Sequence, residues 1–204
     1  VEVVGDELNE DYAKLAGLSA EEDLEEPIFR SVKKRLPWLF VLLVMGLGVS
    51  ATVGLFESIV AQLPVIMSFQ SLILDMAGNV GTQSLAVTIR VLMDENLTGK
   101  EKLHLVFKEM KVGFLNGMIL GVMAFVFIGI YACTLKGNPT AHAFLISGCV
   151  GFALMLSMVI SSMVGTMVPM FFHKIKVDPA VASGPLITTV NDLVAVVTYY
   201  GLVW

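Results

Sequence analysis

Five apolar stretches, each long enough to cross a bilayer as a helix, constrain the fold of this 204-residue chain most. A bilayer core needs roughly 20 apolar residues per helix, because each residue rises about 1.5 Å. Charged residues make up only 15% of the chain, against about 25% in soluble domains. We therefore expect an all-α membrane protein with five transmembrane helices. The expected spans cover about residues 37–62, 64–93, 112–135, 140–172 and 178–204.

Composition and net charge exclude several other classes of protein. Disorder requires low hydrophobicity, whereas 56% of these residues are hydrophobic. The net charge of −5 excludes a strongly basic nucleic-acid binder, so we expect no nucleic-acid partner. The two cysteines, Cys133 and Cys149, lack the spacing of a disulfide scaffold or a zinc site. We interpret both as small buried hydrophobic residues.

The charged residues divide the chain into two parts. Residues 1–26 hold ten of the 18 acidic residues and one base, Lys14, so their net charge is −9. The rest of the chain holds twelve basic and eight acidic residues, a net charge of +4. We expect residues 1–36 to form an acidic cytoplasmic segment and residues 37–204 to form the transmembrane domain. Because the chain begins with Val1 rather than Met, we also expect it to be a fragment of a longer gene product.

The basic residues predict how the spans are oriented. Positive charge is retained in the cytoplasm, and twelve of the 13 bases lie on the side of the N-terminus in a five-span arrangement. The exception is Lys136, between spans three and four. We therefore expect a multi-pass protein of the plasma or inner membrane, with its N-terminus in the cytoplasm and its C-terminus outside.

The few polar residues inside the spans carry the functional signal, because ionisable residues there usually line a pathway or face a wet cavity. Asp75, Asn79 and Gln83 recur every four residues and so form one stripe on span two. Asp75 lies about 17 Å along span two, and Asp192 roughly 21 Å along span five, so both are near the bilayer centre. No basic residue is deep enough to pair with them. Hard oxygen ligands of this kind suit Mg²⁺ or Ca²⁺.

Further residues of the spans are candidates for the same pathway or its gate. Thr188 lies one helical turn before Asp192 on the same face, and Asn191 directly precedes Asp192. Gly184, next to a proline, marks a place where the helix can loosen and expose a carbonyl. Glu57, near the outer end of span one, is either an interfacial carboxylate without a role or an attractor of cations at the outer mouth.

Packing gives most of these residues an alternative role. Asn79 and Gln83 also suit interhelical hydrogen bonding, and Asp75 suits a hydrogen bond that packs two helices. Asp192 has the alternative of a protonated carboxyl group hydrogen-bonded within the bundle. The glycines that allow close helix approach are Gly46, Gly48, Gly78, Gly81, Gly117, Gly121, Gly148 and Gly151.

Residues 75–84, Asp-Met-Ala-Gly-Asn-Val-Gly-Thr-Gln-Ser, resemble the GGNxGxQS signature of MgtE-type magnesium channels, with Ala77 in place of the first glycine. Four further segments are similar to the same family and occur in the same order. They are Lys34–Trp38, Phe56-Glu57, Asp178–Ala180 and Ser183–Asp192. The resemblance covers nearly the whole chain and its five spans.

The resemblance implies a homodimer in a lipid bilayer, with an ion pathway on the two-fold axis lined by spans two and five. It assigns the central ion site to Asp192 and further contacts to the backbone carbonyl of Thr188 and to Asn79. A further pore asparagine of the family falls at Gly184 in this sequence, and this departure argues against a polar constriction there.

The resemblance also concerns regulation. Family members carry a cytoplasmic N-domain, CBS domains and a connecting plug helix, and residues 6–18 look like that helix. The acidic sensing positions then fall at Glu7, Glu10 and Asp11. This chain lacks the N-domain and the CBS domains, so this regulatory metal site would be incomplete. A solvated acidic face explains the same three residues.

We therefore expect a channel or transporter rather than an enzyme. It would move Mg²⁺ into the cytoplasm down the electrochemical gradient of the ion, and Mg²⁺ would be both the transported ion and the bound ligand. Two Asp192 carboxylates facing each other across the two-fold axis would balance the charge of one hydrated ion. One alternative is an ion- or proton-coupled exporter that uses the same carboxylates. The others are a structural membrane subunit and an intramembrane aspartyl protease, whose usual Gly-x-Gly-Asp pattern is missing.

Overall fold

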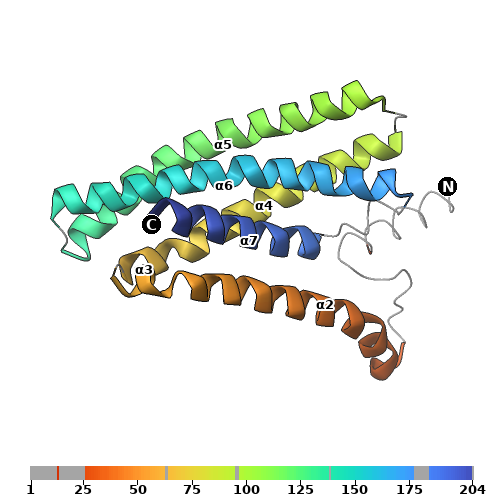
Figure 1. Ribbon diagram of the computed structural model, residues 1–204, viewed down its shortest axis with the longest axis horizontal. Helices are drawn as coiled ribbons and strands as arrows, with labels where there is room; N and C mark the ends of the chain where they lie inside the picture. The colour runs from red at the N-terminus through yellow and green to blue at the C-terminus, as the bar shows by residue number, and fades with distance from the viewer. Residues whose placement is uncertain are drawn as a thin grey trace.

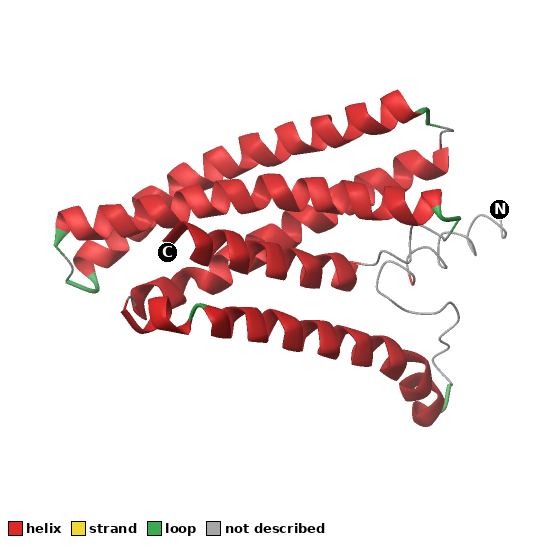
Figure 2. Ribbon diagram, in the orientation of Figure 1, coloured by secondary structure: helices red, strands yellow, loops and turns green. Residues whose placement is uncertain are grey.

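The computed structural model describes residue 13 and residues 26–62, 64–94, 97–137, 139–176 and 184–203. All regular structure in these residues is helical (Figure 2). The helices are α2 (Ile28–Leu55), α3 (Glu57–Gln62), α4 (Pro64–Asp94), α5 (Gly99–Thr134), α6 (Thr140–Lys174) and α7 (Gly184–Val203). The five long helices follow the five apolar stretches of the sequence in order, which confirms the all-helical fold class.

Three of the described helices, α2, α5 and α6, are long and apolar enough to cross a membrane by length and composition. The other two long helices, α4 and α7, contain the polar residues that the sequence singled out. Such residues lower the hydropathy of a helix, and they are tolerated in a bilayer where they face a protein interior or water. The number of membrane spans therefore stays a prediction for α4 and α7.

Helix α6 lies against three other helices, α4, α5 and α7, and so forms the centre of the bundle (Figure 1). Helix α2 lies at the edge of the bundle, where it packs mainly on α7. None of the residues of α2 is fully buried. The single chain thus has a packed core of four helices, with the first long helix along one side.

Small residues let α5 and α6 pack closely. A Cβ added to Gly121 would lie 2.7 Å from the carbonyl oxygen of Gly151, and one added to Gly117 would lie 2.9 Å from Cα of Met155. Membrane helices commonly approach each other through such residues. The predicted packing role is confirmed for these glycines, whereas Gly46 and Gly48 of α2 have no atom within 4 Å of an added Cβ.

Two tyrosines of α7 connect the last turns of that helix to the start of α4. The hydroxyl of Tyr199 donates to the carbonyl of Ile66 at 2.8 Å, and that of Tyr200 donates to Oε1 of Gln70 at 2.5 Å. The ring of Tyr200 also stacks on Phe56, with 5.4 Å between ring centroids. These contacts hold α4, α7 and the end of α2 together at one end of the bundle.

The first expected span differs from the helix found. The prediction was one span over residues 37–62, but α2 begins at Ile28, ends at Leu55 and is separated from α3 by a turn at Phe56. At its start, Glu26 forms ion pairs with Arg30 at 3.2 Å and Lys34 at 2.8 Å. The acidic segment and the apolar helix are therefore joined by specific contacts.

Helix α5 extends well beyond its expected span of residues 112–135. It begins at Gly99 because Thr98 and Glu101 form a capping box. The Glu101 carboxylate accepts from the Thr98 backbone amide at 2.7 Å, and the Thr98 hydroxyl accepts from the Glu101 amide at 3.4 Å. At about 1.5 Å per residue, its 36 residues exceed the roughly 30 Å of a bilayer core. The first turns of α5 are therefore expected to stand in water.

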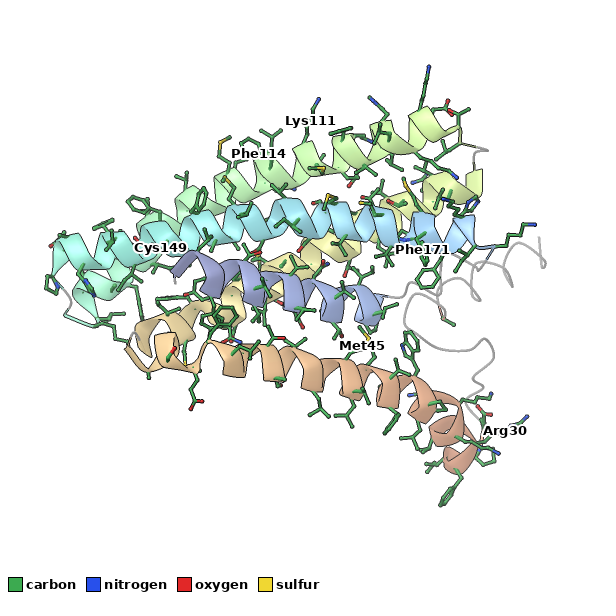
Figure 3. All side chains as sticks on the ribbon, viewed as in Figure 1. Arg30, Met45, Lys111, Phe114, Cys149 and Phe171 are labelled. Atoms are coloured by element: carbon green, nitrogen blue, oxygen red, sulfur yellow. The ribbon has the colours of Figure 1, made fainter. Side chains whose placement is uncertain are left out.

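The outside of the bundle is apolar, as expected for a surface in contact with lipid. Phe114 of α5 and Phe171 of α6, labelled in Figure 3, are among its exposed side chains. Cys149 is exposed on α6, and Cys133 is partly exposed. The interpretation of the two cysteines as buried residues is therefore wrong, and Cys149 lines a groove together with Ile66 of α4 and Tyr199 of α7.

Candidate ion pathway

Helices α4 and α7 pack against each other in an antiparallel register, which sets the level of every candidate residue on them. Tyr199 lies beside Ile66 at one end of the pair. Farther along, Gly78 of α4 lies against Thr188 of α7. A Cβ added to Gly78 would be 3.0 Å from the Cγ2 atom of Thr188. This register places Asp75 level with Asp192.

The two carboxylates are neighbours as the register requires. Asp192 is partly exposed, Asp75 is exposed, and the charge of Asp75 acts on Asp192. Within the described part of the chain, neither carboxylate forms a salt bridge. Two neighbouring carboxylates on a helix pair attract a cation.

The amides of the α4 stripe point away from α7. Asn79 and Gln83 are exposed in the single chain and line a cavity of about 580 Å³ between α4, α5 and α6. Asn79 lies one turn from Asp75 on the same face of α4. The stripe predicted from four-residue spacing is therefore a continuous polar face, with the carboxylate pair at one end and the cavity along the rest.

Asn191, a candidate pore residue, is placed differently from its neighbour Asp192. It is fully buried against Gly81 of α4, where an added Cβ would collide with the Asn191 amide. Among the described residues the amide has no hydrogen-bond partner. In the single chain Asn191 lies inside the α4–α7 contact.

The start of α7 contains the other two candidates of that helix. The helix begins at Gly184, so Pro185 occupies its first turn, where a missing amide hydrogen is tolerated. The described part of α7 is continuous from there. Thr188 lies inside regular helix, where its carbonyl already accepts a backbone hydrogen bond, so one lone pair is left for an ion or its water.

The remaining candidates lie away from this face or outside the described residues. Glu57 is exposed in the first turn of α3, beyond the turn that ends α2. A carboxylate is favoured at the start of a helix, which agrees with either role predicted for it. Glu7, Glu10 and Asp11 fall outside the residues that the structure describes, and so does residue 178, the expected start of span five.

A buried polar contact between α4 and α5 was not predicted from the sequence. The Ser84 hydroxyl donates to the carboxylate of Glu109 at 3.0 Å, and both side chains are buried. Glu109 stands one turn before Gly113, whose added Cβ would collide with Ser162 of α6. A signal was present, because Glu109, Gly113 and Gly117 share one face at four-residue spacing.

No group of three or more His, Cys, Asp or Glu side chains gathers into a metal site within the described part of one chain. The face offers two carboxylates and several amide oxygens, which are hard ligands for a cation that keeps its water. Such a set can bind a hydrated divalent ion weakly, and a second copy would double the charge.

Comparison with known proteins assigns the chain to a family. The family model "MgtE: Divalent cation transporter" matches residues 70–202, which include the polar stripe of α4 and almost all of α7. The chain belongs to the MgtE family. Among its MgtE relatives, the magnesium transporter MgtE of Bacillus subtilis (strain 168) is 37% identical over 202 residues, which cover 99% of this chain and 43% of that protein.

Two further MgtE relatives show the same relationship. The magnesium transporter MgtE of Enterococcus faecalis is 34% identical over 99% of this chain and 42% of its own length. That of Thermus thermophilus is 31% identical over 81% of this chain and 34% of its own length. The chain thus spans less than half the length of these curated relatives.

Proposed function

We propose that this chain is the ion-conducting transmembrane part of an MgtE protein and that it carries Mg²⁺ into the cytoplasm. Membership of the family and the names of the relatives support Mg²⁺ as the cargo. The observation that carries the proposal is the level placement of Asp75 and Asp192 on the antiparallel helices α4 and α7, without a salt bridge in the described residues. An uncompensated carboxylate pair in an apolar bundle requires a cation, a proton or water.

In this proposal two copies of the chain form a homodimer, and the polar faces of α4 and α7 line the pathway between them. One Asp192 from each copy balances the charge of a divalent ion. Mg²⁺ gives up its water reluctantly and demands ideal geometry when dehydrated. Side chains that bind the water shell of the ion therefore suit conduction, since binding must also be weak enough to let the ion leave.

The membrane potential sets the direction in which Mg²⁺ flows. A charge crossing the membrane gains about 2.3 kcal/mol per 100 mV, so a divalent ion gains about 4.6 kcal/mol. The inside-negative potential then drives Mg²⁺ inward without a coupled ion.

We also propose five spans in the plasma membrane, with the N-terminus in the cytoplasm, because the basic residues follow that arrangement. Glu57 would attract cations at the outer mouth, and Glu7, Glu10 and Asp11 would act together with regulatory domains outside this chain.

The test is Mg²⁺ uptake into liposomes that contain the purified 204-residue chain and a Mg²⁺-sensitive dye, under an inside-negative potassium diffusion potential. We expect Asp192→Ala to lower the initial rate about tenfold or more, the equivalent of about 1.4 kcal/mol lost at the ion site. Glu101→Gln is the matched control, since it removes an exposed carboxylate at the start of α5 and leaves the pathway intact.

Two results would contradict the proposal. Normal uptake by a folded, dimeric Asp192→Ala variant would remove the central site from the pathway. Flux that requires a proton gradient, and not merely a membrane potential, would instead identify a proton-coupled carrier that uses the same carboxylates.

A further inference from the structure

The cavity beside the α4 stripe is lined by a third amide side chain, which belongs to neither α4 nor α7. Asn116 of α5 lines it together with Asn79 and Gln83 of α4. The remaining walls include Leu120 of α5 and Met158 of α6. Five of the nine lining residues are apolar, so the three amides and Thr82 form a polar strip along a groove that is open on one side.

The level of Asn116 follows from the register of α4 and α5. These helices run in opposite directions, and the bond between Ser84 and Glu109 places those two residues opposite each other. Asn116, two turns farther along α5, therefore lies level with residue 77 of α4, between Asp75 and Asn79. Its amide is thus on the level of the carboxylate pair rather than at a membrane surface.

Hydrogen bonding in the cavity suits water rather than lipid. The Thr82 hydroxyl donates its hydrogen to the Gly78 carbonyl at 2.9 Å, so its oxygen remains free to accept. Each amide side chain offers an acceptor oxygen and two donor hydrogens. Apolar chains in this space would leave these groups without partners, which is costly in a medium of low polarity.

The size of the cavity fits an ion with its complete water shell. Six waters at about 30 Å³ each occupy roughly 180 Å³, whereas the cavity measures about 580 Å³. Neutral amides that accept hydrogen bonds from the shell can hold such an ion loosely, while the carboxylate pair supplies the charge.

We propose that this cavity is a water-filled vestibule of the ion pathway and that Asn116 is one of its specificity-determining residues, contacting the hydrated divalent ion through its water shell. The inference rests on the proposed function of the chain as an ion pathway. It extends the pathway beyond α4 and α7 to a residue of α5.

Water access is tested by cysteine labelling in the chain with Cys133→Ala and Cys149→Ala. We expect Asn116→Cys, in liposomes, to react with a cationic, membrane-impermeant methanethiosulfonate, and Mg²⁺ to slow this reaction. Ile119→Cys is the matched control, because Ile119 is 57% exposed on the outer side of α5. It should react only with a lipophilic maleimide. Reaction of Asn116→Cys with the lipophilic reagent alone would show lipid in the cavity and would overturn the proposal.

Measurement of Mg²⁺ entry into liposomes tests the role of Asn116 separately from the proposed function on which it rests. We expect Asn116→Leu to slow Mg²⁺ entry about three- to tenfold, the equivalent of one lost hydrogen bond, and Asn116→Ser to restore most of the rate. Ile119→Leu should leave the rate unchanged. Full flux by Asn116→Leu overturns the role of Asn116. If the unsubstituted chain carries no Mg²⁺, the proposed function fails, and the labelling result then decides the water-filled cavity on its own.

Discussion

The hydroxyl of Ser84 donates a 3.0 Å hydrogen bond to the carboxylate of Glu109, and this bond joins α4 to α5. Both side chains are buried, so the bond is shielded from water. Ser84 is the last residue of the signature-like segment, and Glu109 is the only buried acid among the described residues. The bond therefore fixes the helix that carries the polar stripe against the helix that closes the cavity.

We expect Ser84→Ala to destabilise the chain by about 1–3 kcal/mol, because a buried carboxylate loses its donor. Glu109→Leu should also destabilise, and the double variant should lose less stability than the two single variants together. Unfolding in mixed detergent micelles, followed by circular dichroism, gives the three values. Strictly additive losses would contradict a direct interaction between the two residues.

The contact between Gly81 and Asn191 predicts a second effect on stability. Gly81→Ala should destabilise by about 1–3 kcal/mol, because the added methyl group collides with a fully buried amide. Gly46→Ala is the control, since nothing lies within 4 Å of its added Cβ. It should be neutral or stabilising by up to about 1 kcal/mol. Equal effects of the two substitutions in the same unfolding assay would contradict the close contact.

The capping box of α5 predicts a dependence on pH. Hydrogen bonds from the Thr98 side chain and then its backbone hold the pKa of Glu101 below its ordinary value of 4.5. A lowered pKa in the folded state means that the contribution is complete above the unfolded value and is lost as pH falls through the folded value. The melting temperature of the chain should therefore approach that of Glu101→Gln as pH falls from above 4.5 through the lowered folded value. A difference between the two that persists unchanged at pH 3 would contradict the capping role.

The tyrosines of α7 allow hydrogen bonding to be separated from ring packing. Tyr200→Phe removes the bond to Gln70 but keeps the stacking on Phe56, so we expect a loss of about 0.5–1.5 kcal/mol. Tyr200→Leu should cost more, because the stacked ring is lost as well. The order is checked by the midpoint of unfolding in detergent. Equal losses for the two variants would assign the whole effect to the hydroxyl.

Much of the candidate site could be predicted from the sequence because helical periodicity is local. Four-residue spacing alone placed Asp75, Asn79 and Gln83 on one face, and the structure keeps them there. Their depth followed from residue counts, which agree with the level placement of Asp75 and Asp192. Both inferences need only the geometry of a single helix.

Contacts between distant residues could not be predicted in the same way. Asn191 and Asp192 are adjacent, yet one is fully buried and the other partly exposed, since the rotation of α7 is set by its contact with Gly81. Glu109 looks like a solvated residue between Lys108 and Lys111 until its burial against Ser84 is known. Phe56, which follows the end of α2 at Leu55, likewise stacks on Tyr200, far along the chain.

The central claim is that one Asp192 from each of two chains holds a hydrated divalent ion on a two-fold axis. A structure of the chain in lipid nanodiscs at saturating Mg²⁺ tests it most directly. We predict one metal density between the two Asp192 carboxylates. Its distance from each carboxylate should be longer than the roughly 2.0–2.1 Å of direct ligation, because water lies between. Asp192 side chains on opposite outer faces of the dimer, with no density between them, would contradict it.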